Sequence, residues 1–223
     1  MKNIPVTCQY AGSPELIDKV TQAIQVHQNN PKAIAFGIVS ARLLEAILLG
    51  APLGEALATL EQNFPEELKS YEAKEDVVKA FANGKRFGQQ EGKSLDEIVL
   101  VVSHEMMKDK PDSPFYNLYG RSCALPGSFI GPIAQFYKCA TKGGSTTKDV
   151  YAAAIRENIL ASGDTCSRAI FVGATLAAAG VSPSKEDDDV VKWDDAIPEG
   201  WFEKMDQKTM DQIGEAIGLI IGS

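Results

Sequence analysis

The chain has 223 residues, a formal net charge of -8 and 44% hydrophobic residues, which suffices to bury a core in one or at most two domains. The acidic balance argues against a nucleic-acid partner, which would require a basic face. No apolar run reaches the roughly 18 residues of a membrane span, and the first residues lack the apolar core of a secretory signal. We therefore expect a cytoplasmic protein without membrane contact.

Most of the chain carries helical patterns and helix-capping residues. The expected helices cover residues 14–28, 31–49, 52–60, 65–84, 94–107, 148–161, 165–180, 198–205 and 208–221, with a further helix that begins between Pro126 and Pro132. Strand pairs joined by hairpin turns are absent from the pattern. The sequence thus predicts an all-α fold, a single compact multi-helix domain over residues 1–223.

Several segments stand out along this series. Residues 31–49 carry apolar and small residues around most of the helix circumference, so this helix should be buried on more than one side. Residues 85–93, with three glycines nearby, predict a loop, and the irregular segment 115–131 is of the kind that often carries function. Residues 181–196 include three consecutive aspartates, and we expect an exposed acidic insertion loop there.

Cysteine and histidine give no clear site. The four cysteines have no C-x-x-C spacing and no paired histidine, which disfavours zinc; they are Cys8, Cys123, Cys139 and Cys166. We expect reduced thiols that pack as small hydrophobic groups. His27 and His104 stand alone, and a surface or hydrogen-bonded core imidazole explains each without a functional role.

The segment that begins at Glu157 predicts the end of one helix, a sharp turn at Gly163 and the start of another helix. Asp164, Thr165 and Ser167 place oxygen atoms at that second start. These residue types cap helices, and their oxygens also suit a hard cation such as Mg²⁺. The pattern alone leaves both interpretations open.

Two segments resemble the C-terminal signature of the ADP-ribosylglycohydrolase/J1-crystallin family. They are Ser162-Gly-Asp-Thr-Cys-Ser-Arg-Ala169 and Ala196-Ile-Pro-Glu-Gly-Trp201. Residues 10–16, 26–30 and 122–129 are similar to the J1-crystallin branch, so the resemblance covers nearly the whole chain. It implies an all-helical fold with two central Mg²⁺ ions, an ADP-ribose-type ligand and hydrolysis of the bond that joins ADP-ribose to an acceptor.

By this resemblance, the C-terminal metal motif of the family falls on Asp164, Cys166 and Ser167. Asp164 and Ser167 keep oxygen donors, whereas Cys166 stands where the family has a second carboxylate. A thiol is a soft ligand that suits zinc or copper better than magnesium. Asp164 and Ser167 are therefore the expected metal ligands, and no catalytic residue is assigned.

The N-terminal metal ligands of the family are missing from the pattern. Its Thr-Asp-Asp cluster and early Gly-Asp turn have no counterpart here, and the only aspartate before residue 76 is Asp18, inside a predicted helix. We expect a chain truncated at its N-terminus relative to the family, with half a metal site and weak or no Mg²⁺ binding.

Three hypotheses follow for function. The chain is a structural, crystallin-like or ligand-binding protein without hydrolase activity of its own. Alternatively, it is a Mg²⁺-dependent hydrolase whose missing ligands come from an absent N-terminal segment or a partner chain, or it is an unrelated helical module. Truncation should leave the apolar flanks of helices 31–49 and 165–179 partly open, so we expect self-association.

Overall fold

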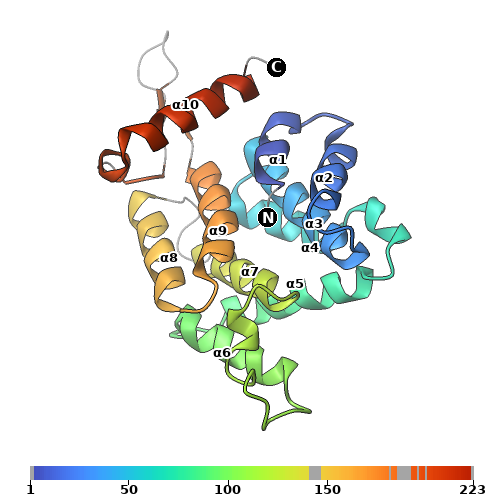
Figure 1. Ribbon diagram of the computed structural model, residues 1–223. Coiled ribbons are helices and arrows are strands. Elements are labelled where there is room, and N and C mark those ends of the chain that lie inside the picture. The colour runs from blue at the N-terminus through green and yellow to red at the C-terminus, as the bar shows by residue number, and fades with distance from the viewer. Residues whose placement is uncertain are drawn as a thin grey trace.

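The computed structural model describes residues 3–140, 147–180, 182–184, 192–194, 196–198 and 200–221. It confirms the all-α prediction, and Figure 1 shows the helices gathered around a common centre. The α-helices are α1 (Ile4–Tyr10), α2 (Leu16–Gln25), α3 (Pro31–Leu48), α4 (Leu53–Gln62), α5 (Lys74–Gly88), α6 (Leu95–Met106), α7 (Gly127–Ala140), α8 (Lys148–Leu160), α9 (Thr165–Gly180) and α10 (Gln207–Ile221). Short 3-10 helices lie at η1 (Glu66–Ser70), η2 (Tyr119–Arg121) and η3 (Phe202–Lys204).

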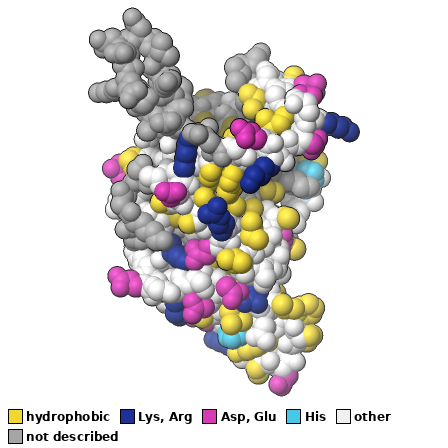
Figure 2. Space-filling view, turned by 90° about the vertical axis from the view of Figure 1, so that its left-hand side faces the viewer, with side chains coloured by type: hydrophobic (Ala, Val, Ile, Leu, Met, Phe, Trp, Pro, Cys, Tyr) yellow, Lys and Arg dark blue, Asp and Glu magenta, His cyan; other side chains and the backbone are white. Residues whose placement is uncertain are grey.

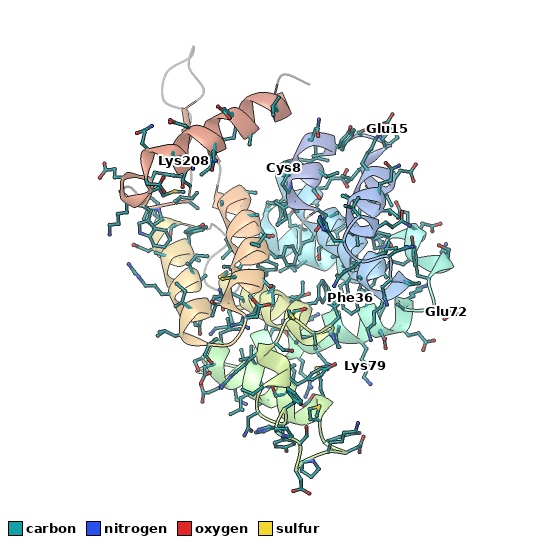
Figure 3. All side chains as sticks on the ribbon, viewed as in Figure 1. Cys8, Glu15, Phe36, Glu72, Lys79 and Lys208 are labelled. Carbon is teal, nitrogen blue, oxygen red and sulfur yellow. The ribbon has the colours of Figure 1, made fainter. Side chains whose placement is uncertain are left out.

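Helix α3 is the centre of the hydrophobic core, as its sequence predicts. It lies against α1, α2, α4, α5 and α9. The Asn30 side chain accepts hydrogen bonds from the N–H groups of Lys32 and Ala33 at its start. Just after its end, Gly50 has a φ of 98°, a left-handed conformation that glycine adopts without strain. Phe36 lies in the interior, while charged side chains such as Glu72 project outward (Figure 3).

The prediction of one charged helix over residues 65–84 is wrong in its extent. The chain forms η1 first, and α5 then continues to Gly88, through part of the expected loop. The reason is the packing of α5 against α7. A Cβ atom on Gly84 would lie 2.5 Å from Ile133 Cγ2, and one on Gly88 would lie 2.3 Å from the carbonyl oxygen of Ala134. These glycines permit a close helix crossing; Gly84 lies inside the helix, and Gly88 is its last residue.

The segment after α9 also differs from the prediction. Strands β1 (Ser182–Ser184) and β2 (Lys192–Asp194) form an antiparallel pair in which Pro183 lies opposite Trp193. The prediction that the chain has no strand pair is therefore wrong. The pair is not apparent from the sequence because no Asn-Gly or Asp-Gly turn lies between the two strands to indicate a hairpin. Ala196, expected in an exposed loop, is buried because it packs on the core. The acidic residues 185–191 lie outside the described residues.

The C-terminal region and the helix flanks complete the arrangement. Helix α10 contacts α1 and lies across the top of the molecule in Figure 1. The flanks of α3 and α9, expected to be partly open, are mostly covered because these helices pack against each other and their neighbours. Apolar exposure remains at Leu49 (63%) and Ile170 (50%). Within the described residues, no helix is both long and apolar enough to cross a bilayer.

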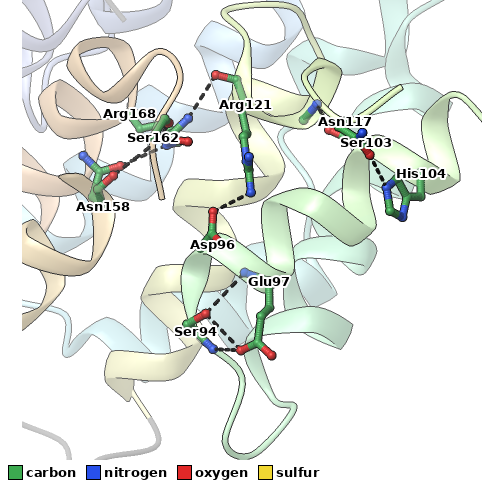
Figure 4. Close-up of polar contacts among 11 residues, drawn as sticks. Ser94, Asp96, Glu97, Ser103, His104, Asn117, Arg121, Asn158, Ser162 and Arg168 are labelled. Carbon is green, nitrogen blue, oxygen red and sulfur yellow. Dashed lines mark hydrogen bonds and ion pairs between the residues drawn. The ribbon is translucent and has the colours of Figure 1, made fainter. Parts of the chain in front are cut away.

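The four cysteines differ in burial, and His104 has two polar or aromatic neighbours. None of the four cysteines forms a disulfide, and Cys139 alone among them is buried, so three of them do not pack as small hydrophobic groups. They differ because Cys139 lies on the core side of α7, whereas Cys8, Cys123 and Cys166 face the surface. His104 Nε2 forms a hydrogen bond of 2.8 Å with Asn117 Oδ1 (Figure 4). The His104 ring also stacks on Tyr116.

Candidate functional site

The turn between α8 and α9 has a backbone that requires glycine at one position. Gly163 has a φ of 70°, and a Cβ atom there would lie 2.4 Å from the carbonyl oxygen of Arg121. The preceding Ser162 is also left-handed, with a φ of 56°. The N–H of Asp164 donates to the same Arg121 carbonyl at 2.7 Å. The turn is therefore held directly against the segment that contains η2.

Asp164 acts as the cap of α9. Its Oδ1 accepts a hydrogen bond of 3.1 Å from the N–H of Ser167, and its side chain is half-buried. A carboxylate at this position also interacts favourably with the positive end of the helix dipole. Capping, one of the two interpretations that the sequence left open, is thus present in the structure.

Arg168 fixes the turn from the inside. Its side chain is 1% exposed and donates to Asn158 Oδ1 at 3.0 Å and to the carbonyl oxygens of Arg121, Asn158 and Ser162 (Figure 4). Burial lowers the pKa of Arg168, and the charge of Asp164 opposes that shift. Sequence reasoning missed Arg168 and Asn158; the signal was a single charged residue at the head of an apolar helix.

The irregular segment 115–131 holds the Gly163 turn from the side opposite to Arg168. The Arg121 guanidinium pairs with Asp96 Oδ1 on α6 at 2.5 Å, while its carbonyl accepts from the turn. The N–H of Gly120 donates to Ser103 Oγ, also on α6. This segment, expected to carry function because it is irregular, therefore positions the Gly163 turn relative to α6.

A cleft of about 420 Å³ opens beside the turn, between α2, α3, α7 and α9. Ser167 lines it, whereas Asp164 and Cys166 do not. The polar side chains along its described lining are those of His27, Gln28, Ser40, Cys123, Ser128 and Ser167. The volume lies within the range of about 300–1,000 Å³ that is typical of small-molecule sites. The sequence analysis did not assign His27, Gln28, Ser40 or Ser128 to a common site, because these residues lie in segments that are far apart in the sequence and meet only in the folded chain.

The residues carried over as metal ligands do not make a complete cation site. Asp164 and Ser167 are half-buried and adjacent, and Cys166 is exposed. Among the described residues, no group of three or more His, Cys, Asp or Glu side chains is placed to hold a metal ion. Water usually completes the octahedral oxygen shell of Mg²⁺, but one carboxylate and one hydroxyl are few ligands for two such ions. The residues present do not fit the metal centre of the family by themselves.

Comparison with known proteins agrees with the resemblance of the turn. The ADP-ribosylglycohydrolase family model matches residues 1–221. Crystallin J1A of Tripedalia cystophora is 26% identical over 174 residues, which cover 78% of this chain and 42% of that relative. This chain thus spans less than half of the length of that protein, and no solved structure matches it significantly. The chain belongs to the ADP-ribosylglycohydrolase family.

Proposed function

We propose that this chain is a ligand-binding member of the family that retains the helical scaffold and a cleft but does not hydrolyse ADP-ribosyl bonds by itself. The observation that carries the proposal is the use of Asp164. It is the single carboxylate of the 162–168 turn, and it caps α9 through the N–H of Ser167. The second carboxylate expected in this motif is replaced by Cys166.

The chemistry of hydrolysis explains why this matters. Family members generally depend on metal, and a metal centre activates water and stabilises charge on the reacting group. Affinity for a hard divalent cation follows the number and charge of the oxygen ligands. With Asp164 and Ser167 alone, a Mg²⁺ ion would remain mostly hydrated and weakly held.

Two residues at the start of α9, Ser167 and Arg168, support ligand binding. Ser167 lines the cleft, and the hydrogen bonds of the Arg168 side chain hold the start of α9 in place. Family membership suggests an ADP-ribose-type ligand for this cleft. The similarity to a protein named a crystallin supports a role in which the scaffold is kept without the reaction.

A second candidate is a Mg²⁺-dependent hydrolase whose remaining ligands come from outside this chain. The match with crystallin J1A covers 42% of that relative, so sequence beyond the matched part exists there. Reading the genomic sequence upstream of Met1 discriminates the two candidates. An in-frame Gly-Asp turn followed by a Thr-Asp-Asp cluster would favour the hydrolase.

The direct test is hydrolysis of ADP-ribosylated peptides by the purified chain with added Mg²⁺. We expect no rate above that of the solution without protein. Asp164→Asn keeps an oxygen that can cap α9 but removes the charge, so it is the matched control for metal-dependent activity. Mg²⁺-dependent hydrolysis that disappears in a folded Asp164→Asn variant would contradict the proposal.

A further inference from the structure

We propose that a second pocket, between α5, α6 and the start of α7, binds a small organic anion. The apolar part of this ligand lies on the pocket floor, and lysine side chains hold its acidic group, which is a carboxylate or a phosphate. The pocket has a volume of about 670 Å³, within the range of about 300–1,000 Å³ that is typical of small-molecule sites. Its described lining has no residue in common with that of the cleft beside Ser167, so this site goes beyond the proposed function.

The floor of the pocket is apolar and belongs to the hydrophobic core. Helices α5 and α6 each pack against α7, and one side chain from each helix reaches the floor. These side chains are Phe87, Val102 and Ile130, each of which is 2% exposed, so the floor is fixed before any ligand arrives. Met106 and Pro126 are half-buried and extend the apolar surface toward solvent. An apolar group bound here would therefore remove this surface from water.

Two carboxylates line the pocket, and each has a basic partner. The Asp76 carboxylate forms an ion pair of 2.6 Å with Lys32 Nζ in the first turn of α3. Glu105 pairs with Arg86 Nη2 at 2.8 Å, and the Arg86 guanidinium also lies over the ring of Phe87, 4.2 Å from its centroid. The negative charges of the lining are thus balanced locally, which reduces their repulsion of an incoming anion.

Two further lysines give the pocket its positive charge. Lys79 of α5 and Lys108, just after α6, both line the pocket and are exposed. Lys79 projects from the side of α5 on which α6 lies (Figure 3). Because Asp76 and Glu105 are already paired, these two ammonium groups create a positive potential on a chain whose net charge is -8. Ammonium groups hold carboxylates and phosphates by charge-assisted hydrogen bonds.

The floor and the lysines select different parts of a ligand. An inorganic anion would contact the lysines and leave the apolar floor in water, and a neutral apolar molecule would leave the lysines without a partner. An organic anion with a small apolar body uses both features. The positive charge of Lys79 and Lys108 also disfavours a cationic ligand.

Calorimetric titration without added metal compares phenyl phosphate and benzoate with benzyl alcohol and inorganic phosphate. The first two probes carry both a ring and a charge, and each of the others lacks one of them. At low ionic strength, we expect the tighter of the two organic anions to bind at least about ten-fold more tightly than either control. That anion also identifies the acidic group as phosphate or carboxylate. Equal affinity of a control, or no binding of either organic anion at millimolar concentration, overturns the proposal.

Lysine variants place the binding in this pocket. We expect Lys79→Gln and Lys108→Gln each to weaken the tighter organic anion by at least about three-fold, because each removes a positive charge from the lining. Lys110→Gln is the matched control, since Lys110 is also exposed, two residues further on, and is not part of the described lining. The control should leave the affinity unchanged. Equal losses in all three variants, or no loss in any, overturns the proposal.

A variant of the other cleft separates this site from the proposed function. Ile170 lines the cleft beside Ser167 and is 50% exposed, so Ile170→Trp narrows that cleft from α9. We expect this variant to bind the organic anion as the unmodified chain does. Loss of binding in Ile170→Trp, with unchanged binding in Lys79→Gln, would place the anion in the cleft and overturn the proposal. Hydrolysis of ADP-ribosylated peptides by the unmodified chain would overturn only the proposed function.

Discussion

Arg168 is a buried guanidinium whose hydrogen bonds go to one side-chain amide and three backbone carbonyls, with no carboxylate as a direct partner. Replacing it with methionine would leave buried acceptors without donors. Since hydrogen bonds to charged groups contribute about 1.5–3 kcal/mol each, we expect Arg168→Met to lower the free energy of unfolding by at least about 3 kcal/mol. Urea denaturation followed by circular dichroism measures the change.

Arg156 offers a matched control for that variant. It lies on the neighbouring helix α8 and is exposed. We expect Arg156→Met to change the free energy of unfolding by no more than about 0.5 kcal/mol. Similar losses in both variants would show that Arg168 does not hold the turn in the way described.

The residues of the turn also show where sequence reasoning stops. Asp164 and Gly163 were predictable because capping and left-handed turns are local. The role of Arg168 was not, since its acceptors at Arg121 and Asn158 become neighbours only when the segment 115–131 packs against the α8–α9 turn.

At the scale of the elements, the crossing of α5 and α7 depends on two glycines one helical turn apart. In Gly88→Ala the new methyl group would approach the Ala134 carbonyl oxygen and Tyr137 Cβ, to 2.3 and 2.8 Å. Overpacking of this kind costs about 1–3 kcal/mol, which we expect to exceed the gain in helix propensity. Thermal denaturation measures the effect.

Gly173→Ala in α9 is the control for the crossing. Its Cβ atom would lie 3.5 Å from the Tyr151 hydroxyl, an ordinary contact, so the helix propensity of alanine should prevail. We expect stability to stay the same or to rise by up to about 1 kcal/mol. Destabilisation in Gly173→Ala as large as that in Gly88→Ala would contradict the close-crossing explanation.

The start of α6 provides a pH-dependent test. The Ser94 N–H and hydroxyl groups donate to Glu97 Oε2 at 2.8 and 2.9 Å and lower the pKa of Glu97. A lowered pKa stabilises the fold above the unfolded pKa and ceases to do so as pH falls through the folded pKa. Compared with Glu97→Gln, the unmodified chain should gain thermal stability above about pH 5 and lose that gain on acidification. A difference that grows at low pH would contradict this.

The elements that the sequence predicted well begin or end with local signals. The capping box at Ser94 and the cap at Asn30 start α6 and α3 where expected. The end of α5 was missed because Asn83-Gly84 resembles a helix end until the neighbours of Gly84 on α7 are known. The strands were missed because their pairing has no turn signal.

At the scale of the whole molecule, the face that carries α8 mixes hydrophobic, basic and acidic side chains (Figure 2). At the C-terminal end of α8, Ile159 is 57% exposed and Leu160 is 77% exposed. Exposed apolar groups favour association, so we expect concentration-dependent self-association in sedimentation velocity experiments. Leu160→Gln should weaken it, and a monomer at every concentration would contradict the expectation.

The all-α fold was predictable, because helical periodicity and the family resemblance each indicate it. The cleft beside the turn was not, since its lining comes from α2, α3, α7 and α9 and from the segment before α7. The metal ligands Asp164 and Ser167 remain a prediction.

The central claim is that this chain holds only a fragment of the divalent-cation site of its family. Calorimetric titration of Mg²⁺ into the purified chain, with Asp164→Asn as the control, tests it most directly. The account predicts weak heats without a defined stoichiometry and no difference between the two proteins. Tight binding of one or two ions per chain that is lost in Asp164→Asn would contradict it.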